Sequence, residues 1–100
     1  MAIRAVITDD EASARAGIRA LLARDGDIEV VAECTSVTDT VRAIVERRPE
    51  LLFLDVQLSA SSGLQLLERL PEKQRPVIIF VRPTRPTRAM RSIVTPPTIS

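Results

Sequence analysis

Hydrophobic residues in this chain follow two alternating patterns: short continuous runs, and longer stretches in which they recur every three or four positions. The short runs are rich in valine, isoleucine and leucine, as is typical of buried parallel strands. They occupy residues 3–8, 28–33, 51–56 and 77–81. Stretches with helical spacing separate successive runs, at residues 12–24, 37–48 and around 64–70. The order predicts right-handed crossovers and a mostly parallel sheet with helices on both faces.

The helical spacing also predicts which side chains face the sheet. The expected inward residues are Ala14, Ile18, Leu21 and Leu22 in the first helix, Val41, Ile44 and Val45 in the second, and Leu64, Leu66, Leu67 and Leu70 in the third. We expect a turn at residues 25–27 to end the first helix and Pro49 to end the second. The serines at 59, 61 and 62 supply an N-cap for the third helix. Arg15 and Arg19 fall on the polar side of the first helix and are interpreted as solvated charges.

Length and charge limit the protein to one modest domain without a general attraction to polyanions. The chain has 100 residues, 14 of them basic and 13 acidic, so we expect no direct binding of nucleic acid and no attraction to an anionic membrane. No apolar run approaches the roughly 20 residues of a membrane-spanning helix, and the start lacks a signal-type pattern. These features predict a cytoplasmic protein. Cys34 is the single cysteine, which excludes an internal disulfide and a thiolate metal cluster.

Three aspartates carry the clearest chemical signal. Asp9 and Asp10 close the first apolar run, and Asp55 closes the third. Ligands of open parallel sheets bind outside the carboxyl ends of the strands, and neighbouring carboxylates repel one another unless a cation or a proton joins them. An aspartate after a strand is often only a helix N-cap, and a single one at position 55 would be read as a loop carboxylate. Together, the three predict a divalent-metal site beside a reactive carboxylate.

Three segments resemble the receiver domain of two-component response regulators. They are AVITDDE, DIEVVAE, and LLFLDVQL followed by Gly63, and the resemblance covers residues 1–81. The segment LPEKQRPVIIFV is most similar to the subgroup whose receiver precedes a LytTR-type DNA-binding domain. The resemblance implies a flavodoxin-like α/β fold, a doubly wound parallel sheet in three α/β/α layers with strand order 2-1-3-4-5.

The resemblance also implies a role for each acidic residue. Asp55 matches the phosphoacceptor, and Asp9 and Asp10 match the acidic pair that holds Mg²⁺ together with Asp55 and the main-chain carbonyl of Gln57. Mg²⁺ prefers oxygen ligands and is commonly shared between carboxylates and phosphate. The phosphoryl donor would be a phosphohistidine of a sensor histidine kinase. The resemblance therefore implies a phosphorelay signalling protein and not an enzyme.

Two enzyme classes are alternatives to this interpretation. A flavin- or nucleotide-binding domain would need a loop rich in glycine or hydroxyl groups after the first strand, where this chain has Asp9, Asp10 and Glu11. A phosphatase of the haloacid dehalogenase type would need a second aspartate two positions after the first, and Gln57 occupies that position. A metal-dependent phosphohydrolase stays as the less favoured alternative.

The last residues, RPTRPTRAMRSIVTPPTIS, depart from the family pattern. Arg82 stands where the family has the threonine or serine that senses the phosphoryl group, and no lysine follows Lys73. Four prolines after residue 82 disfavour a long helix or a central strand. We therefore expect an incomplete fold. Residues 1–81 would form a partial receiver with strands 1–4, residues 82–100 an irregular tail, and the fifth strand and last helix would be missing.

A frameshift is our hypothesis for this departure. Deleting one base from GTC ACG GCC TAC, which encodes Val-Thr-Ala-Tyr, leaves codons for Val-Arg-Pro-Thr, the residues at 81–84. The same neighbouring frame allows Ala-Asp-Tyr-Leu within residues 89–100, as the family has before its Lys-Pro. The chain would then be a truncated fragment of a longer DNA-binding regulator, impaired in switching. The alternative is a non-switching interaction fragment or pseudogene product. An uncovered fourth strand would permit self-association.

Overall fold

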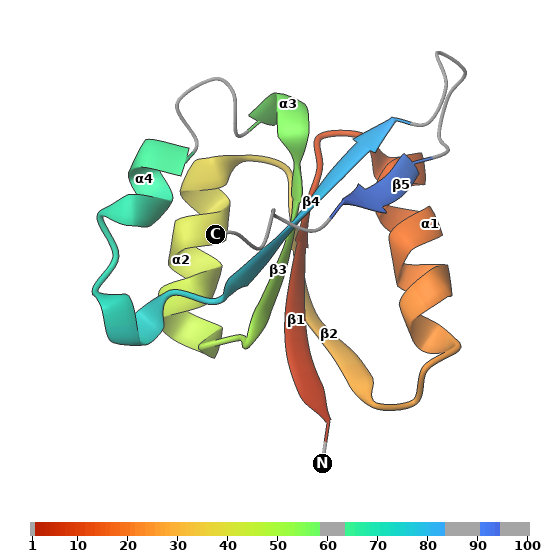
Figure 1. Ribbon diagram of the computed structural model, residues 1–100, viewed down its shortest axis with the longest axis horizontal. Helices are drawn as coiled ribbons and strands as arrows, with labels where there is room; N and C mark the ends of the chain where they lie inside the picture. Colours follow the sequence, from red (N-terminus) through yellow and green to blue (C-terminus); the bar gives the residue numbers. More distant parts are fainter. Residues whose placement is uncertain (1, 59–63, 84–90, 95–100) are drawn as a thin grey trace.

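The computed structural model of the protein describes residues 2–58, 64–83 and 91–94, and its helices and strands alternate along most of the chain (Figure 1). The elements are β1 (Ile3–Thr8), α1 (Ala12–Ala23), β2 (Ile28–Cys34), α2 (Val37–Arg47), β3 (Leu51–Asp55), α3 (Val56–Leu58), α4 (Leu64–Glu68), the 3₁₀ turn η2 (Glu72–Gln74), β4 (Val77–Pro83) and β5 (Arg91–Val94). The four predicted strands and the first two helices are confirmed, with ends within two residues of those expected. The short helix α3 was not predicted, and the serines proposed as an N-cap lie outside the described residues.

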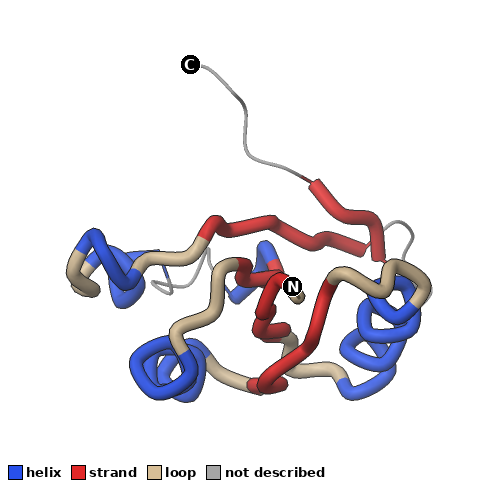
Figure 2. Tube along the Cα trace, turned by 90° about the horizontal axis from the view of Figure 1, so that it is seen from below, coloured by secondary structure: helices blue, strands red, loops and turns tan. Residues whose placement is uncertain are grey.

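The strands form one sheet in the order β2-β1-β3-β4-β5. β1 pairs in parallel with β2 and β3, and β3 pairs in parallel with β4. Helix α1 lies on one side of the sheet, and α2 and α4 lie on the other (Figures 1 and 2). The flavodoxin-like doubly wound fold is therefore confirmed.

Each face of the sheet has its own hydrophobic core, because side chains alternate between the faces along each strand. Val6, Leu52 and Leu54 pack with Ile44 and Leu67 on the side of α2 and α4. The residues between them on the same strands, among them Ala5, Ile7 and Phe53, pack with Ile18 and Leu22 of α1. Strands β1 and β3 are therefore buried on both faces, which explains their continuous apolar sequence.

Three predicted core positions are wrong. Leu21 is 48% exposed, Val45 is 50% exposed and Leu64, the first residue of α4, is 36% exposed. Leu21 comes just before the buried Leu22, and Val45 comes just after the buried Ile44. One residue along a helix is a rotation of about 100°. The contact stripe of α1 is centred on the i, i+4 series that contains Ile18, so Leu21 falls at its edge. The same rotation takes Val45 away from the sheet.

The prediction that residues 82–100 are irregular and lack a fifth strand is wrong for part of that segment. Strand β4 continues to Pro83, and Arg91–Val94 forms β5, which pairs antiparallel with residues 80–83. An uncovered strand presents unsatisfied backbone groups to any segment that can pair with it, and the β-branched Ile93 and Val94 favour a strand. β5 is short and antiparallel, so it differs from the parallel fifth strand of the expected fold. The described residues contain no helix after β4.

None of the helices in the described part of the chain has the length and apolar character needed to cross a bilayer.

Replacing Ile44 by Ala should lower the free energy of unfolding by about 2–5 kcal/mol, because it leaves a cavity in a fully buried site. Val45→Ala, its neighbour on the exposed side of α2, should change that free energy by only about 0.5 kcal/mol. Urea unfolding followed by circular dichroism measures both. Equal losses for the two variants would contradict the observed rotation of α2.

Candidate functional site

The three predicted aspartates meet at one edge of the sheet. β1 and β3 are adjacent and parallel, with Thr8 opposite Leu54, so the residues that follow these two positions emerge side by side. One carboxylate oxygen from each of Asp9, Asp10 and Asp55 lies within 4.8 Å of the others. Asp9 and Asp55 are buried, and Asp10 is exposed. The cluster is therefore closed on the side of the sheet and reached by solvent at Asp10.

Asp9 is held by three hydrogen bonds that use different parts of the residue. Its amide donates to the Cys34 carbonyl of β2 at 3.0 Å. Its Oδ1 accepts from the Glu11 amide at 2.9 Å, and its main-chain carbonyl accepts from Nη1 of Arg15 at 2.7 Å. The residue is thus fixed to β2 and α1 as well as to its own strand.

Asp55 is oriented by the start of the short helix that follows it. Its Oδ1 accepts from the Gln57 amide at 3.0 Å, an arrangement that stabilises the negative charge of the carboxylate. The main-chain amide of Gln57 therefore lies next to the Asp55 carboxylate. The role of the Gln57 carbonyl as a metal ligand stays a prediction.

The donor set of this cluster fits a hard divalent cation. All three side chains offer carboxylate oxygens, and the exposed side at Asp10 allows water to complete the coordination, as Mg²⁺ prefers. A cation there would also relieve the repulsion among three neighbouring carboxylates. The cluster could hold a metal ion in the manner that the sequence predicts.

A hydrogen bond between two buried hydroxyls lies at the end of β1, next to Asp9 in the chain. Thr8 and Thr40 place their Oγ1 atoms 2.5 Å apart, and the Thr40 hydroxyl donates to the Ser36 carbonyl at 2.8 Å. A hydroxyl has one proton, so Thr8 is the donor between the two threonines. The bond ties the end of β1 to α2. Sequence reasoning missed this pair, because nothing in the local pattern links residues 32 positions apart.

Cys34 lies beside the threonine pair and is buried. Burial raises the pKa of its thiol. A raised pKa leaves less thiolate at neutral pH, so the thiol is not activated as a nucleophile. Cys34 therefore serves as a packing residue of the core at the end of β2.

The prediction that Arg15 is a solvated charge is wrong. Its side chain is only 18% exposed, and its Nε lies 3.4 Å from Oε1 of Glu33. Arg19 forms an ion pair with the same carboxylate and is 57% exposed. The available sequence signal was the four-residue spacing of the two arginines, which places them on one helix face.

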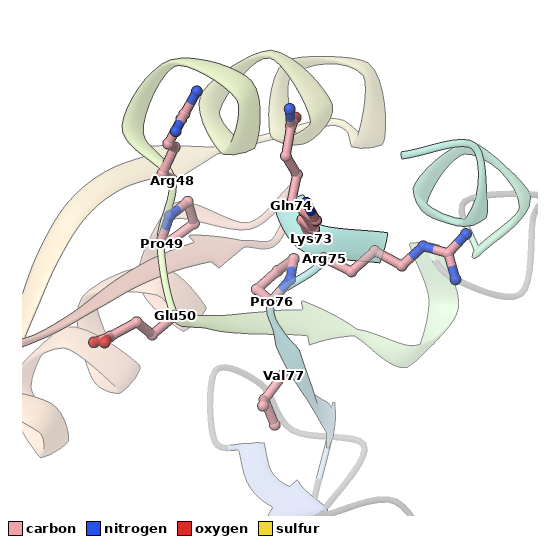
Figure 3. Close-up of a pocket in the computed structure, with 8 residues that line it drawn as sticks. All are labelled: Arg48, Pro49, Glu50, Lys73, Gln74, Arg75, Pro76 and Val77. Atoms are coloured by element: carbon pink, nitrogen blue, oxygen red, sulfur yellow. The ribbon is translucent and has the colours of Figure 1, made fainter. Parts of the chain in front are cut away.

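A separate cavity of about 550 Å³ lies near the amino ends of β3 and β4, whereas the acidic cluster lies at the carboxyl ends of β1 and β3 (Figure 3). Its lining includes Arg48, Lys73 and Arg75 with Glu50 as the single carboxylate. Arg75 turns away toward α4, where it donates to the carbonyls of Glu68 and Leu70. The donor set of this cavity therefore does not suit a divalent cation, although the cavity is spacious.

Residues 5–94 match the family described as the response regulator receiver domain. The chain belongs to this family. The match continues past residue 81, where the resemblance noted in the sequence ends. The acidic cluster of Asp9, Asp10 and Asp55 lies within the matched residues.

Several curated relatives support the same assignment. The chain is 40% identical over 79 residues to the transcriptional regulatory protein BtsR of Salmonella typhi, covering 79% of this chain and 33% of that protein. It is 39% identical over 79 residues to BtsR of Escherichia coli strain K12, with the same shares covered. The receiver domain thus spans about a third of the length of these relatives. Those proteins are named as transcriptional regulators.

A solved structure agrees on the fold. The signal receiver domain of NarL from Mycobacterium tuberculosis superimposes with a TM-score of 0.64 over 81% of this chain and 66% of that chain. The two sequences are 21% identical, so this likeness shows the shared fold alone.

Proposed function

We propose that this receiver domain accepts one phosphoryl group on Asp55 from a sensor histidine kinase, with Mg²⁺ held by Asp9, Asp10, Asp55 and the Gln57 carbonyl. The observation that carries the proposal is the convergence of three carboxylates within 4.8 Å at the ends of two central parallel strands. Family membership supports the same chemistry. The role proposed is that of a signal acceptor, not of an enzyme that turns over a substrate.

In the proposed reaction, an Asp55 carboxylate oxygen attacks phosphorus as the bond between phosphorus and the histidine nitrogen breaks. The main-chain amide of Gln57 donates to Oδ1 of Asp55 and holds the carboxylate plane in one orientation. This orientation favours an in-line approach of the phosphoryl group. Asp9 is fixed in the sheet edge and Asp10 lies at the solvent side, so the donor would enter past Asp10. Mg²⁺, when bound, would neutralise charge on the transferred phosphoryl oxygens.

Replacing Asp55 by Asn should abolish phosphorylation, because an amide cannot form the acyl phosphate. Incubation with Mg²⁺ and acetyl phosphate should add one acid-stable, base-labile phosphoryl group to the unmodified protein, measured by intact-protein mass spectrometry. Asp27→Asn is the matched control, because it changes an exposed aspartate just before β2, at the other end of the strands from the cluster. This variant should be phosphorylated normally. Rapid multiple-turnover hydrolysis of phosphomonoesters would instead favour the phosphohydrolase alternative.

Replacing Asp10 by Ala should remove measurable Mg²⁺ binding while leaving the fold intact, because Asp10 is exposed and supplies an oxygen ligand. Isothermal titration calorimetry of Mg²⁺ into the unmodified and Asp10→Ala proteins measures the effect. Asp27→Ala removes the same charge away from the cluster and should bind Mg²⁺ normally. Identical titrations for all three proteins would refute the metal site.

We further propose that transmission of the signal is impaired. Arg82 occupies the position of the family's switch hydroxyl, and no lysine follows Lys73. A one-base frameshift in a longer LytTR-type regulator would account for both departures. Without these groups a phosphoryl group on Asp55 lacks its usual side-chain contacts, and the domain would retain interaction surfaces without switching.

The edge of β4 supports a proposal of self-association. β5 pairs with residues 80–83 only, and Val77, at the start of β4, is 62% exposed. Because such an apolar edge can pair with another chain, a second copy of the domain is the proposed partner.

Replacing Val77 by Lys should shift the protein toward monomer, because an edge lysine opposes strand pairing. Size-exclusion chromatography with light scattering measures the shift, with Glu72→Lys as a control outside the strand. Phosphorylation by acetyl phosphate should leave the size distribution unchanged if switching is impaired. A concentration-independent monomer would rule out self-association, and phosphorylation-dependent dimers would rule out the impairment.

A further inference from the structure

Three side chains connect the acidic cluster to the outer surface of α1 and β2. Arg15 donates from Nη1 to the main-chain carbonyl of Asp9 at 2.7 Å, and its Nε lies 3.4 Å from Oε1 of Glu33. Glu33 binds Arg19 through its other carboxylate oxygen. The contacts form one chain, Arg19 to Glu33 to Arg15 to the Asp9 carbonyl, between α1, β2 and the loop after β1.

The Asp9 carbonyl belongs to the peptide bond that joins Asp9 to Asp10. That peptide is planar, so a hydrogen bond that fixes its oxygen also fixes the direction in which the chain continues to Asp10. Hydrogen bonds from a charged donor are about twice as strong as neutral ones. The half-buried guanidinium is therefore placed where it sets the relative orientation of the two carboxylates.

We propose that Arg15 is a positioning residue for the cation site, holding the Asp9–Asp10 peptide so that both carboxylates reach the same ion. The inference rests on the proposed function, since it assumes that the cluster binds Mg²⁺. Glu33 serves two purposes in this arrangement. It holds the guanidinium in place, and its negative charge reduces the repulsion that Arg15 would exert on a nearby cation.

Charge and geometry make opposite predictions for the loss of Arg15. Removing a positive charge beside three carboxylates should strengthen cation binding by Coulomb attraction alone. Losing the hydrogen bond to the Asp9 carbonyl should weaken cation binding, because the peptide can then rotate. Measuring the direction of the change therefore separates a positioning role from a purely electrostatic one.

The experiment compares Arg15→Gln with Arg19→Gln in the full chain. Both variants remove one positive charge that pairs with Glu33, and of the two arginines it is Arg15 that hydrogen-bonds to the Asp9 carbonyl. Mg²⁺ affinity by calorimetry should fall about tenfold or more in Arg15→Gln, as for other residues that orient metal ligands. It should stay within about twofold in Arg19→Gln, an exposed pair. Arg15→Lys, which retains one charged donor, should recover part of the affinity.

A metal-free measurement accompanies the titration. Amide signals of Asp10 and Glu11 in ¹H–¹⁵N spectra should shift in Arg15→Gln and stay in place in Arg19→Gln. If Arg15→Gln fails to fold, Arg15→Lys serves instead, because it keeps the positive charge and changes the geometry of the donor; it should weaken Mg²⁺ binding, whereas a purely electrostatic role would leave the affinity unchanged.

Unchanged or tighter Mg²⁺ binding in Arg15→Gln, or in Arg15→Lys where the first does not fold, would overturn the positioning role. Equal changes in Arg15→Gln and Arg19→Gln would do the same. Failure of the unmodified protein to bind Mg²⁺ or to accept a phosphoryl group would instead refute the proposed function. The two failures are therefore distinguishable in one set of samples.

Discussion

The parallel pairing of β1 with β3 is the constraint on which the site depends. Both strands are buried on both faces, so neither can slip by one residue without moving a complete set of side chains to the opposite face. Their register places Thr8 opposite Leu54, and the carboxyl ends of the strands then lie at one edge. The hydrophobic packing of the two central strands thereby determines the distance between Asp9 and Asp55.

That packing gathers negative charge, and the surrounding structure counteracts the repulsion. Main-chain amides of Glu11 and Gln57 donate to Asp9 and Asp55, and the guanidinium of Arg15 binds the carbonyl next to them. Such donors stabilise carboxylates without occupying the solvent side of the cluster. The cluster therefore stays open at Asp10, where a cation from solution could reach the three carboxylates.

The β4 side of the sheet differs from the centre. Val77 is largely exposed and Ile78, Ile79 and Phe80 are half-buried, whereas the strands on the other side of β3 have helices against them. β5 satisfies part of the β4 backbone in antiparallel orientation. The acidic site depends on β1 and β3, whereas the incompletely covered edge belongs to β4. The acidic site can therefore be intact although the β4 edge is incompletely covered.

The sequence by itself determined strands β1 to β4, the first two helices and the residues of the acidic cluster. Those features follow from local periodicity and from the rule that parallel strands end at a common edge, which needs no knowledge of side-chain contacts. The tertiary structure alone decided the exposure of Leu21 and Val45, because that depends on how far each helix is rotated about its axis.

The structure also decided the contacts of Arg15 and of the Thr8–Thr40 pair, which join residues far apart in the chain. The pairing of β5 with β4 belongs to the same group: local prolines and arginines predict an irregular segment, whereas an available strand edge provides a partner that local sequence does not contain.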